Sequence, residues 1–408
     1  MIFTVKNDKF KAMDITQKSK KLNIAMVCDP IADYTAGSFV STLRFAEILN
    51  KLGHKIVFIA ARSPLHHTDN YYKNIKIYRF PSLLLPKTEK KFYISLPAIN
   101  KIKKIFVAEK IDVLSIIIPT PAAIVAAKAA KALGIKIVYH SHTQPENLFL
   151  HLPKAIGGKR INNLFYKYLT WICNQADAIV FPSEFSKKLL ANLKNSVKTK
   201  VISNGVDINK FKKIDAEKFF IKFNLPRRTK NILFVGRLHP EKSIDTLIKA
   251  LPLILMKQPN ARLWIAGSGH LQTELEQLTQ ELNLTEKIVF FGRMNDEDLV
   301  SIYNACDLFV LPSLAELEGM VVLEAMACGK PILIADAPNS ASVYFVNQNG
   351  LLFKPEDPRN LAEQALKILT NDQLRRAMGE ASFRDSRRFD INQSVQTLEK
   401  LYYEILQL

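Results

Sequence analysis

Two glutamates separated by seven residues, Glu316 and Glu324, are the side chains of this sequence best placed to do chemistry. Glu316 stands on a loop after the apolar run 308–311, and Glu324 stands among leucine, alanine and methionine in a helical stretch. A carboxylate in apolar surroundings is costly unless a partner hydrogen-bonds to it. Because each carboxylate can accept two hydroxyl hydrogen bonds, the pair suits a polyhydroxylated ligand. The ordinary alternative is that Glu316 caps the helix and Glu324 pairs with a lysine.

The stretch 307–336 predicts the elements that would position these acids. An apolar strand ends at a Pro-Ser loop, a helix follows over 320–328, and a second strand covers 331–335. Strand, loop, helix and strand make one βαβ unit, and in open α/β sheets ligands bind beyond the carboxyl ends of the strands. Gly319 and Met320, where the helix opens, complete the expected ligand-binding set of this stretch.

A second group of candidates lies in Gly236-Arg237-Leu-His-Pro-Glu-Lys242, which follows another predicted strand. Arg237 can bind a phosphate with two parallel hydrogen bonds, and Lys242 adds a point charge. Both precede a predicted helix N-terminus, where a diphosphate would be stabilised. Downstream, a loop with Gly267 and Gly269 follows the next strand and would permit close backbone approach. The alternative for a lone arginine or lysine is a solvated loop charge.

The first half of the chain offers fewer candidates. Gly37 lies where a helix predicted over 39–52 begins, so backbone amides could approach an anion there. His142 follows a strand predicted over 136–139 and would face the same cleft. The alternatives are an ordinary βα turn and a loop histidine that makes structural hydrogen bonds.

Composition and the order of predicted elements indicate two α/β domains. With 408 residues and 48% hydrophobic residues, the chain can fill two cores. Strands and helices alternate in each half, which predicts two Rossmann-like parallel sheets that face one cleft. The predicted organisation is a disordered basic extension, 1–20, an N-terminal Rossmann-like domain, 21–208, a linker, 209–230, a C-terminal Rossmann-like domain, 231–388, and a C-terminal helix, 389–408.

The formal charge of +19 indicates an anionic partner. The sequence shows no nucleic-acid module, so an anionic membrane or a phosphorylated ligand is the preferred partner. The four scattered cysteines have no metal spacing and favour reduced thiols in a cytoplasmic protein. We find no signal-peptide core and no convincing transmembrane helix.

Glu316, seven residues and Glu324, followed by Ala-Met-Ala-Cys-Gly-Lys-Pro, resemble the E-x7-E signature of the GT4 family of retaining glycosyltransferases. The resemblance implies the GT-B fold, with a last helix that crosses back onto the N-terminal domain. It also implies a nucleotide-sugar donor whose sugar contacts Glu316 and whose ribose is held by Glu324. The Gly-Arg-x3-Glu-Lys spacing matches the donor-diphosphate site of the family, and His142 matches its N-domain histidine.

The resemblance implies a catalytic set of His142, Arg237, Lys242 and Glu316. The stretch Ser-His-Thr-Gln-Pro-Glu-Asn around His142 also resembles family members that glucosylate diacylglycerol. Asp296-x-Asp298 mimics the metal-binding motif of another glycosyltransferase fold, but we interpret it instead as an N-cap and a first-turn acid, which suit the helix dipole. We therefore expect no required metal or cofactor.

The sequence thus predicts a retaining hexosyltransferase, with UDP-glucose as the expected donor and a membrane lipid or lipid-linked molecule as the expected acceptor. It would be cytoplasmic and peripherally bound to the inner face of the membrane. The alternatives are a transferase for a soluble or polysaccharide acceptor, a nucleotide-sugar epimerase of the same fold, and a non-catalytic GT-B-like binding module.

Three segments of the first half are candidate membrane or acceptor surfaces: 80–97, 100–110 and 147–171. The second is a basic amphipathic helix with Ile102, Ile105 and Phe106 on one stripe. Such a helix can lie on an anionic membrane. The alternative is a surface helix that packs this stripe on the sheet.

Overall fold

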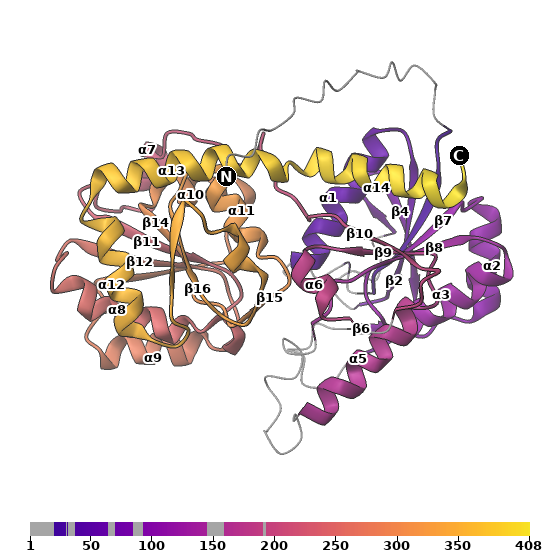
Figure 1. Ribbon diagram of the computed structural model, residues 1–408, viewed down its shortest axis with the longest axis horizontal. Coiled ribbons are helices and arrows are strands. Elements are labelled where there is room, and N and C mark those ends of the chain that lie inside the picture. The colour runs from indigo at the N-terminus through magenta and orange to yellow at the C-terminus, as the bar shows by residue number, and fades with distance from the viewer. Residues whose placement is uncertain are drawn as a thin grey trace, which may run out of the picture.

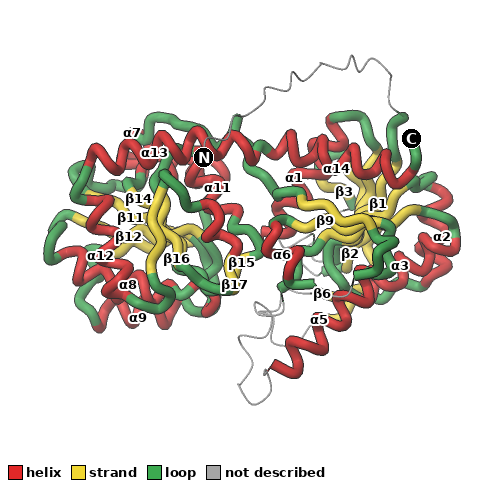
Figure 2. Tube along the Cα trace, viewed as in Figure 1, coloured by secondary structure: helices red, strands yellow, loops and turns green. Residues whose placement is uncertain are grey.

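The computed structural model describes residues 20–29, 31, 37–63, 70–84, 93–144, 159–190 and 193–408. Two lobes lie side by side, each built on a largely parallel sheet with helices packed around it (Figure 1, Figure 2). This arrangement confirms the predicted α/β class with two Rossmann-like halves. Of the predicted N-terminal extension, only Lys20 lies within the described residues.

The first lobe contains an eight-stranded sheet in the order β10-β9-β8-β7-β1-β2-β4-β3, in which β3 alone is antiparallel to its neighbour. The strands are β1 (Asn23–Val27), β2 (Lys55–Ala61), β3 (Tyr71–Tyr72), β4 (Ile75–Phe80), β7 (Val113–Ile116), β8 (Lys136–His140), β9 (Ala178–Phe181) and β10 (Lys198–Val201). The central strands β1, β2, β7, β8 and β9 are largely buried on both faces, which explains their nearly continuous apolar sequences.

Helices cover both faces of this sheet, each over its own apolar core. One core includes α1 (Gly37–Lys51) and α14 (Ile391–Leu406). The other includes α2 (Ile99–Ala108), α3 (Pro121–Ala132) and α5 (Lys159–Cys173). A hairpin of β5 (Ser82–Leu84) and β6 (Tyr93–Ser95) and the short α6 (Glu184–Lys188) complete the described lobe.

The apolar stripe of α2 faces the protein interior. Ile102 and Phe106 are fully buried in the core beneath the sheet, and Ile105 packs against that core. The prediction that this stripe rests on a membrane is therefore wrong, because the sheet already covers it. None of the described helices is long and apolar enough to span a bilayer.

The second lobe contains a six-stranded parallel sheet in the order β13-β12-β11-β14-β16-β18. The strands are β11 (Lys230–Val235), β12 (Ala261–Ala266), β13 (Ile288–Gly292), β14 (Leu308–Leu311), β16 (Ile332–Ala335) and β18 (Gly350–Phe353). The helices are α7 (Glu217–Lys222), α8 (Ile244–Leu255), α9 (Gln272–Glu281), α10 (Asp296–Ala305), α11 (Met320–Ala327), α12 (Pro358–Leu369) and α13 (Asp372–Ser386). Two short parallel strands, β15 (Ala315–Glu316) and β17 (Asn339–Ser340), lie apart from this sheet. The predicted βαβ unit thus appears as β14, α11 and β16.

The segment 209–230, predicted as a linker, is packed into the second lobe. It contains α7, and Phe211 and Phe219 are buried in the core of that lobe. Phe219 also lies in an aromatic cluster with Trp264 and Phe291. Its many lysines suggested a solvated connector, but the buried aromatic side chains anchor it.

The C-terminal helix α14 returns to the first lobe, as Figure 1 shows. Val206 and Asp390 form an isolated parallel bridge where the chain crosses between the lobes. His54 Nδ1 accepts a hydrogen bond from the Leu22 amide at 3.1 Å, so Nε2 carries the proton that is donated to Glu399 on α14 at 2.8 Å. These contacts fix the last helix against the first sheet.

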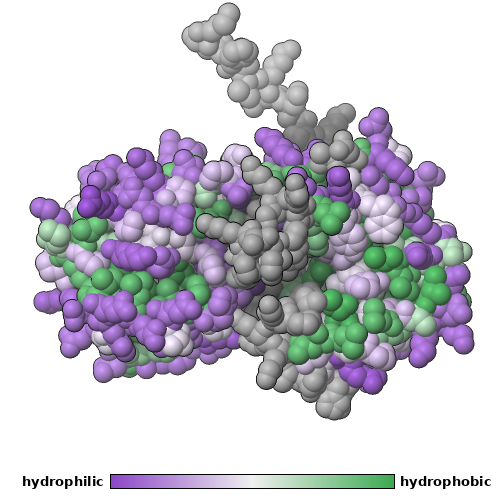
Figure 3. All heavy atoms as spheres, turned by 90° about the horizontal axis from the view of Figure 1, so that it is seen from below, coloured by the Kyte–Doolittle hydropathy of each residue, from purple (hydrophilic) through white to green (hydrophobic). Residues whose placement is uncertain are grey.

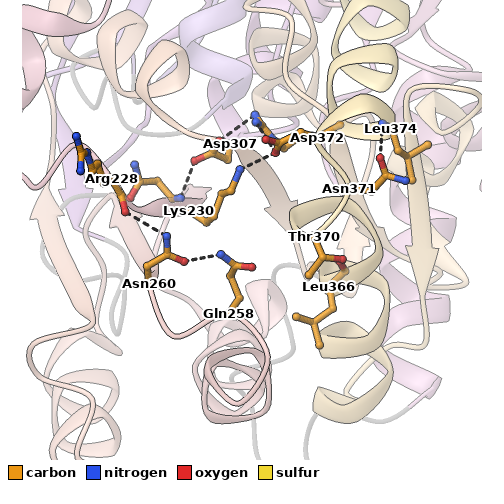
Figure 4. A network of polar contacts seen from close by, with 12 residues as sticks. Arg228, Lys230, Gln258, Asn260, Asp307, Leu366, Thr370, Asn371, Asp372 and Leu374 are labelled. Carbon is orange, nitrogen blue, oxygen red and sulfur yellow. Dashed lines mark hydrogen bonds and ion pairs between the residues drawn. The ribbon is translucent and has the colours of Figure 1, made fainter.

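A network of polar contacts lies at the amino-terminal edge of the second sheet (Figure 4). Asp307 accepts a hydrogen bond from the Asn231 amide at 2.9 Å and pairs with Arg375 at 2.9 Å. Asp372, at the start of α13, pairs with Lys230 at 2.7 Å and with Arg375 at 3.0 Å. The network joins the start of β11 to α13 on the side of the sheet away from the carboxyl ends.

Candidate active site

A cleft of about 410 Å³ opens between the carboxyl-terminal edges of the two sheets. The first lobe contributes residues of α1 and of the loop after β8, and the second lobe contributes the loops after β11, β12, β13 and β14. Ten of the eleven predicted site residues line it: Gly37, His142, Gly236, Arg237, Lys242, Gly267, Glu316, Gly319, Met320 and Glu324.

Lys242 and Glu316 form an ion pair inside the cleft. Lys242 ends a short 3-10 turn after β11, and Glu316 lies on β15 after β14, so residues 74 positions apart meet with Nζ 2.5 Å from Oε1. Each side chain is only 12% exposed. Glu316 therefore does not cap the following helix, and a cation and an acid from two loops converge at one point.

Arg237 lines the same cleft and is held by a buried acid. Its guanidinium donates to Glu241 at 3.0 Å, and Glu241 is fully buried while Arg237 is 39% exposed. The interaction fixes the arginine by one side and leaves much of the guanidinium exposed in the cleft. A charge-assisted bond to an anion is available there.

Glu324 on α11 accepts one hydrogen bond from each lobe. Arg44 on α1 donates to Oε1 at 3.0 Å, and Tyr303 on α10 donates to Oε2 at 3.1 Å. Desolvation and the adjacent carboxylate raise the pKa of Tyr303 well above its ordinary value, so it remains a donor. The cation beside Glu324 is thus an arginine of the first lobe and not a lysine.

Glu318 is the most deeply buried acid of the acidic loop. Its Oε2 accepts from the backbone amide of Asn204 at 3.0 Å and from the Asn204 side chain at 2.7 Å, which ties the loop to the crossing point between the lobes. Burial raises the pKa of Glu318 to about 7, against hydrogen bonds from Ser203 and Asn204 that lower it. This carboxyl therefore titrates near neutral pH.

His142 lies on the wall of the cleft formed by the first lobe. Its ring stacks on His140 with the centroids 5.9 Å apart, and His140 is buried. Burial lowers the pKa of His142 to about 4. The imidazole is therefore neutral near pH 7 and can accept one hydrogen bond and donate another.

Glycines allow the loops of the second lobe to come close together. At Gly267 φ is +143°, and a Cβ would lie 1.8 Å from the Gly236 carbonyl oxygen. At Gly319 φ is +97°, and a Cβ would collide with Ser342. Gly269 was predicted to line the cleft but is not among the residues that do so. It packs on Leu238, whose carbonyl oxygen would lie 2.4 Å from a Cβ at position 269.

The acids of the Asp296-x-Asp298 motif lie in the first turn of α10, as predicted, but neither of them is the N-cap. Asn295 is the N-cap of α10 and accepts from the amide of Asp298 at 2.8 Å, and Asp298 is ion-paired with Lys222 at 2.7 Å. In the part of the chain that the structure describes, no three or more His, Cys, Asp or Glu side chains are grouped so that they could hold a metal ion.

Two family models cover most of the chain. The model described as Glycosyltransferase Family 4 matches residues 35–210, and the model described as Glycosyl transferases group 1 matches residues 215–385. The glycosyltransferase MJ1178 of Methanocaldococcus jannaschii is 30% identical over 83% of this chain and 88% of its own length. This chain belongs to glycosyltransferase family 4.

Other relatives of this family 4 glycosyltransferase have more specific names. The alpha-monoglucosyldiacylglycerol synthase of Streptococcus pneumoniae is 24% identical over 85% of this chain and 78% of its own. The N-acetyl-alpha-D-glucosaminyl L-malate synthase of Bacillus anthracis is 24% identical over 95% and 98%. Anabaena Alr3699/HepE, solved in complex with UDP-glucose, superimposes with a TM-score of 0.74 at 21% identity and covers 94% of this chain and 100% of its own. The likeness confirms the predicted GT-B fold.

Sequence reasoning missed several cleft residues of this glycosyltransferase. Arg44, Asn204, Arg293 and Glu318 all line the cleft. Arg44 and Asn204 contact acids that lie 280 and 114 residues further along the chain, so no local spacing reveals them. Glu318 stands two residues after Glu316, and its spacing in the sequence gives it no role. Arg293 was visible only as a residue that follows a strand, a signal shared by many loop residues.

Proposed function

We propose that this enzyme transfers a hexose, with retention of configuration, from a nucleotide sugar to a lipid or lipid-linked acceptor, and that UDP-glucose is the donor. The observation that carries the proposal is the meeting of Lys242, Arg237, Glu316 and Glu324 on one wall of the inter-lobe cleft. Carboxylates accept hydrogen bonds from sugar hydroxyls, and cations bind diphosphate, so the two pairs suit the two ends of one donor.

The cations would stabilise the leaving group. As the bond between sugar and diphosphate breaks, negative charge grows on the diphosphate, and preorganised positive groups lower the energy of that state. Arg237 and Lys242 lie where the loop after β11 feeds α8, so no divalent ion is needed in this scheme. Glu316 would hold the transferred sugar and Glu324 the ribose.

The first lobe would close the reaction space. A neutral His142 on the opposite wall can hydrogen-bond the sugar or the attacking acceptor hydroxyl. Closure around the donor excludes water and so suppresses its hydrolysis. Gly37, where α1 opens onto the cleft, leaves room for the donor phosphates near the helix N-terminus.

A lipid acceptor is supported by the named relative that makes glucosyl diacylglycerol and by the surface of the first lobe. Four large apolar side chains of this lobe are between 48% and 68% exposed: Leu83, Leu96, Leu164 and Trp171. Figure 3 views the molecule from the side on which α5 projects in Figure 1, and hydrophobic patches lie among hydrophilic residues on that lobe. We propose that this side rests peripherally on an anionic cytoplasmic membrane face. The residues 85–92 and 147–158 of the predicted surfaces lie outside the described residues.

The proposal can be tested by incubating the purified enzyme with UDP-glucose and with other nucleotide sugars. Each incubation is carried out with and without a mixed lipid extract. We expect release of the nucleoside diphosphate only with a lipid acceptor, and a glycolipid by mass spectrometry. A product with a small acid instead would favour a soluble acceptor, as the relative named for L-malate suggests. Epimerisation of the donor sugar in the absence of an acceptor would indicate an epimerase. Absence of any turnover would indicate a non-catalytic binding module.

A further inference from the structure

Arg44 is the one cation of the first lobe that the described structure pairs with a predicted donor-binding acid. Its Nη2 lies 3.0 Å from Glu324 Oε1, with the side chains 18% and 7% exposed. The guanidinium also lies over the ring of the buried Phe211, with Cζ 5.6 Å from the ring centroid. The residue is thus held on two sides where α1 and the second lobe meet.

The carboxylate of Glu324 keeps free acceptor capacity in this arrangement. A carboxylate offers about four lone-pair sites, and Arg44 and Tyr303 occupy one on each oxygen. One site on each oxygen remains for two vicinal hydroxyls. Both Arg44 and Glu324 line the cleft, so a ligand there can reach the acid without displacing the arginine.

Arg44 also has a buried polar atom that no described residue satisfies. Its Nη1 is inaccessible and has no hydrogen-bond partner within the described ranges. An unpaired buried donor costs roughly 1–3 kcal/mol, more when it is charged. Of the two terminal nitrogens, Nη2 therefore carries the contact with Glu324, and Nη1 carries none within the described ranges.

We propose that Arg44 is a positioning residue for the donor nucleotide: it holds Glu324 in the orientation that receives the ribose, and only while the two lobes are together. The inference rests on the proposed function, in which Glu324 binds the ribose. Because coupling between two equilibria is reciprocal, nucleotide binding then favours lobe closure to the same degree that closure favours binding. The first lobe would thereby contribute to donor affinity, although the donor diphosphate lies on the second.

The test compares two probes, UDP and inorganic pyrophosphate, by titration calorimetry on the full chain. Arg44→Met keeps an apolar stem over Phe211 and removes the charged head. We expect the Kd for UDP to rise roughly 10- to 50-fold, as for loss of a charge-assisted hydrogen bond, and the Kd for pyrophosphate to change less than about 2-fold. Arg44→Lys should recover part of the UDP affinity.

A double-mutant comparison separates positioning from a general structural effect. In a Glu324→Gln background, Arg44→Met should weaken UDP binding by less than about 3-fold, because the two residues act through one contact. Lys51→Met, an exposed cation on the same helix, is the matched control and should bind UDP like the wild type. If Arg44→Met does not fold, Arg44→Gln takes its place.

Three results would overturn the inference. The first is a Kd for UDP that is unchanged or lower in Arg44→Met. The second is an equal rise of the Kd for UDP and for pyrophosphate. The third is full additivity of the effects of Arg44→Met and Glu324→Gln on the free energy of UDP binding. In each case wild-type binding of UDP leaves the proposed function standing. If the wild type binds none of UDP, GDP or ADP, the proposed function fails and the inference fails with it.

Discussion

The two edges of the second sheet carry the same kinds of ion pair but differ in what surrounds them. At the carboxyl edge, Lys242 pairs with Glu316 at 2.5 Å, with both side chains 12% exposed beside a cleft of about 410 Å³. At the amino edge, Lys230 pairs with Asp372 at 2.7 Å, and the acid is 58% exposed. Residue types and distances alone therefore do not distinguish a candidate active site from a structural network.

Two features mark the carboxyl edge as the site. Its loops approach so closely that Gly267 has no room for a Cβ beside Gly236. Its acids receive hydrogen bonds from the other lobe, through Arg44 and Asn204. The amino edge instead joins β11 and α13 within one lobe, so its pairs can stabilise the fold without taking part in binding.

The largest expected difference between the edges is in turnover. Glu316→Gln keeps the shape of the side chain and an acceptor for Lys242, but it removes the charge that would hold the transferred sugar. We expect kcat to fall by at least about 100-fold, the scale of losing one preorganised electrostatic contact. Steady-state assay with UDP-glucose and lipid extract measures this, and near-wild-type turnover would remove Glu316 from the site.

Much of the fold was readable from the sequence because the relevant signals are local. The apolar run of β14, the start of α11 after Gly319 and the strand predicted over 331–335 defined one βαβ unit within a few residues. The same locality misled us at 209–230, where lysines suggested a solvated linker although Phe211 and Phe219 are buried. A sparse aromatic pattern among charges gives no periodicity from which burial can be predicted.

The candidate site was predictable on the second lobe and only partly on the first. Two short stretches of sequence identify Arg237 with Lys242 and Glu316 with Glu324, and the fold then brings these stretches together. Arg44 carries no such signal, since its partner lies on another lobe and within a different helix. Contacts between lobes depend on their docking, which spacing along the chain cannot encode.

The next largest effect is a pH-dependent change in the free energy of unfolding, caused by Glu318 at the carboxyl edge. Burial raises the folded-state pKa of Glu318 to about 7 from an ordinary 4.5, so the folded state holds the proton more tightly. The group's stabilising contribution is complete below about pH 4.5 and is lost as pH rises through 7, a change of about 3 kcal/mol. Glu318→Gln, which keeps an acceptor for Asn204, should abolish this part of the pH dependence.

Urea unfolding of the wild type and of Glu318→Gln at pH 5 and pH 8 measures that change. All other titrating groups are common to both proteins and cancel in the difference. The free energy of unfolding of Glu318→Gln minus that of the wild type should be larger at pH 8 than at pH 5. A difference that is equal at the two pH values would mean that this carboxyl is already ionised in the folded protein.

A smaller loss of stability, without loss of activity, is expected at the amino edge. Arg375→Met leaves Asp307, which is 17% exposed, with only the Asn231 amide as a described partner. We expect the free energy of unfolding to fall by about 2 kcal/mol, as for a hydrogen-bonded charge that loses its partner. The exposed neighbour Arg376, changed to Met, is the control and should unfold like the wild type. A fall in kcat for Arg375→Met would show that the two edges are coupled.

The smallest effect is expected for Asp372→Asn, the amino-edge counterpart of Glu316→Gln. Hydrogen bonds from Lys230 and Arg375 hold the pKa of Asp372 at about 2, below its ordinary 3.8. A depressed pKa stabilises the folded state above pH 3.8, and this contribution disappears as pH falls through 2. Because the acid is exposed, the urea midpoint at pH 7 should shift only slightly, and less in high salt. Turnover should equal that of the wild type, because the same change of charge lies on the edge away from the cleft. A loss of turnover like that of Glu316→Gln would mean that ion pairs at both edges of the sheet take part in catalysis.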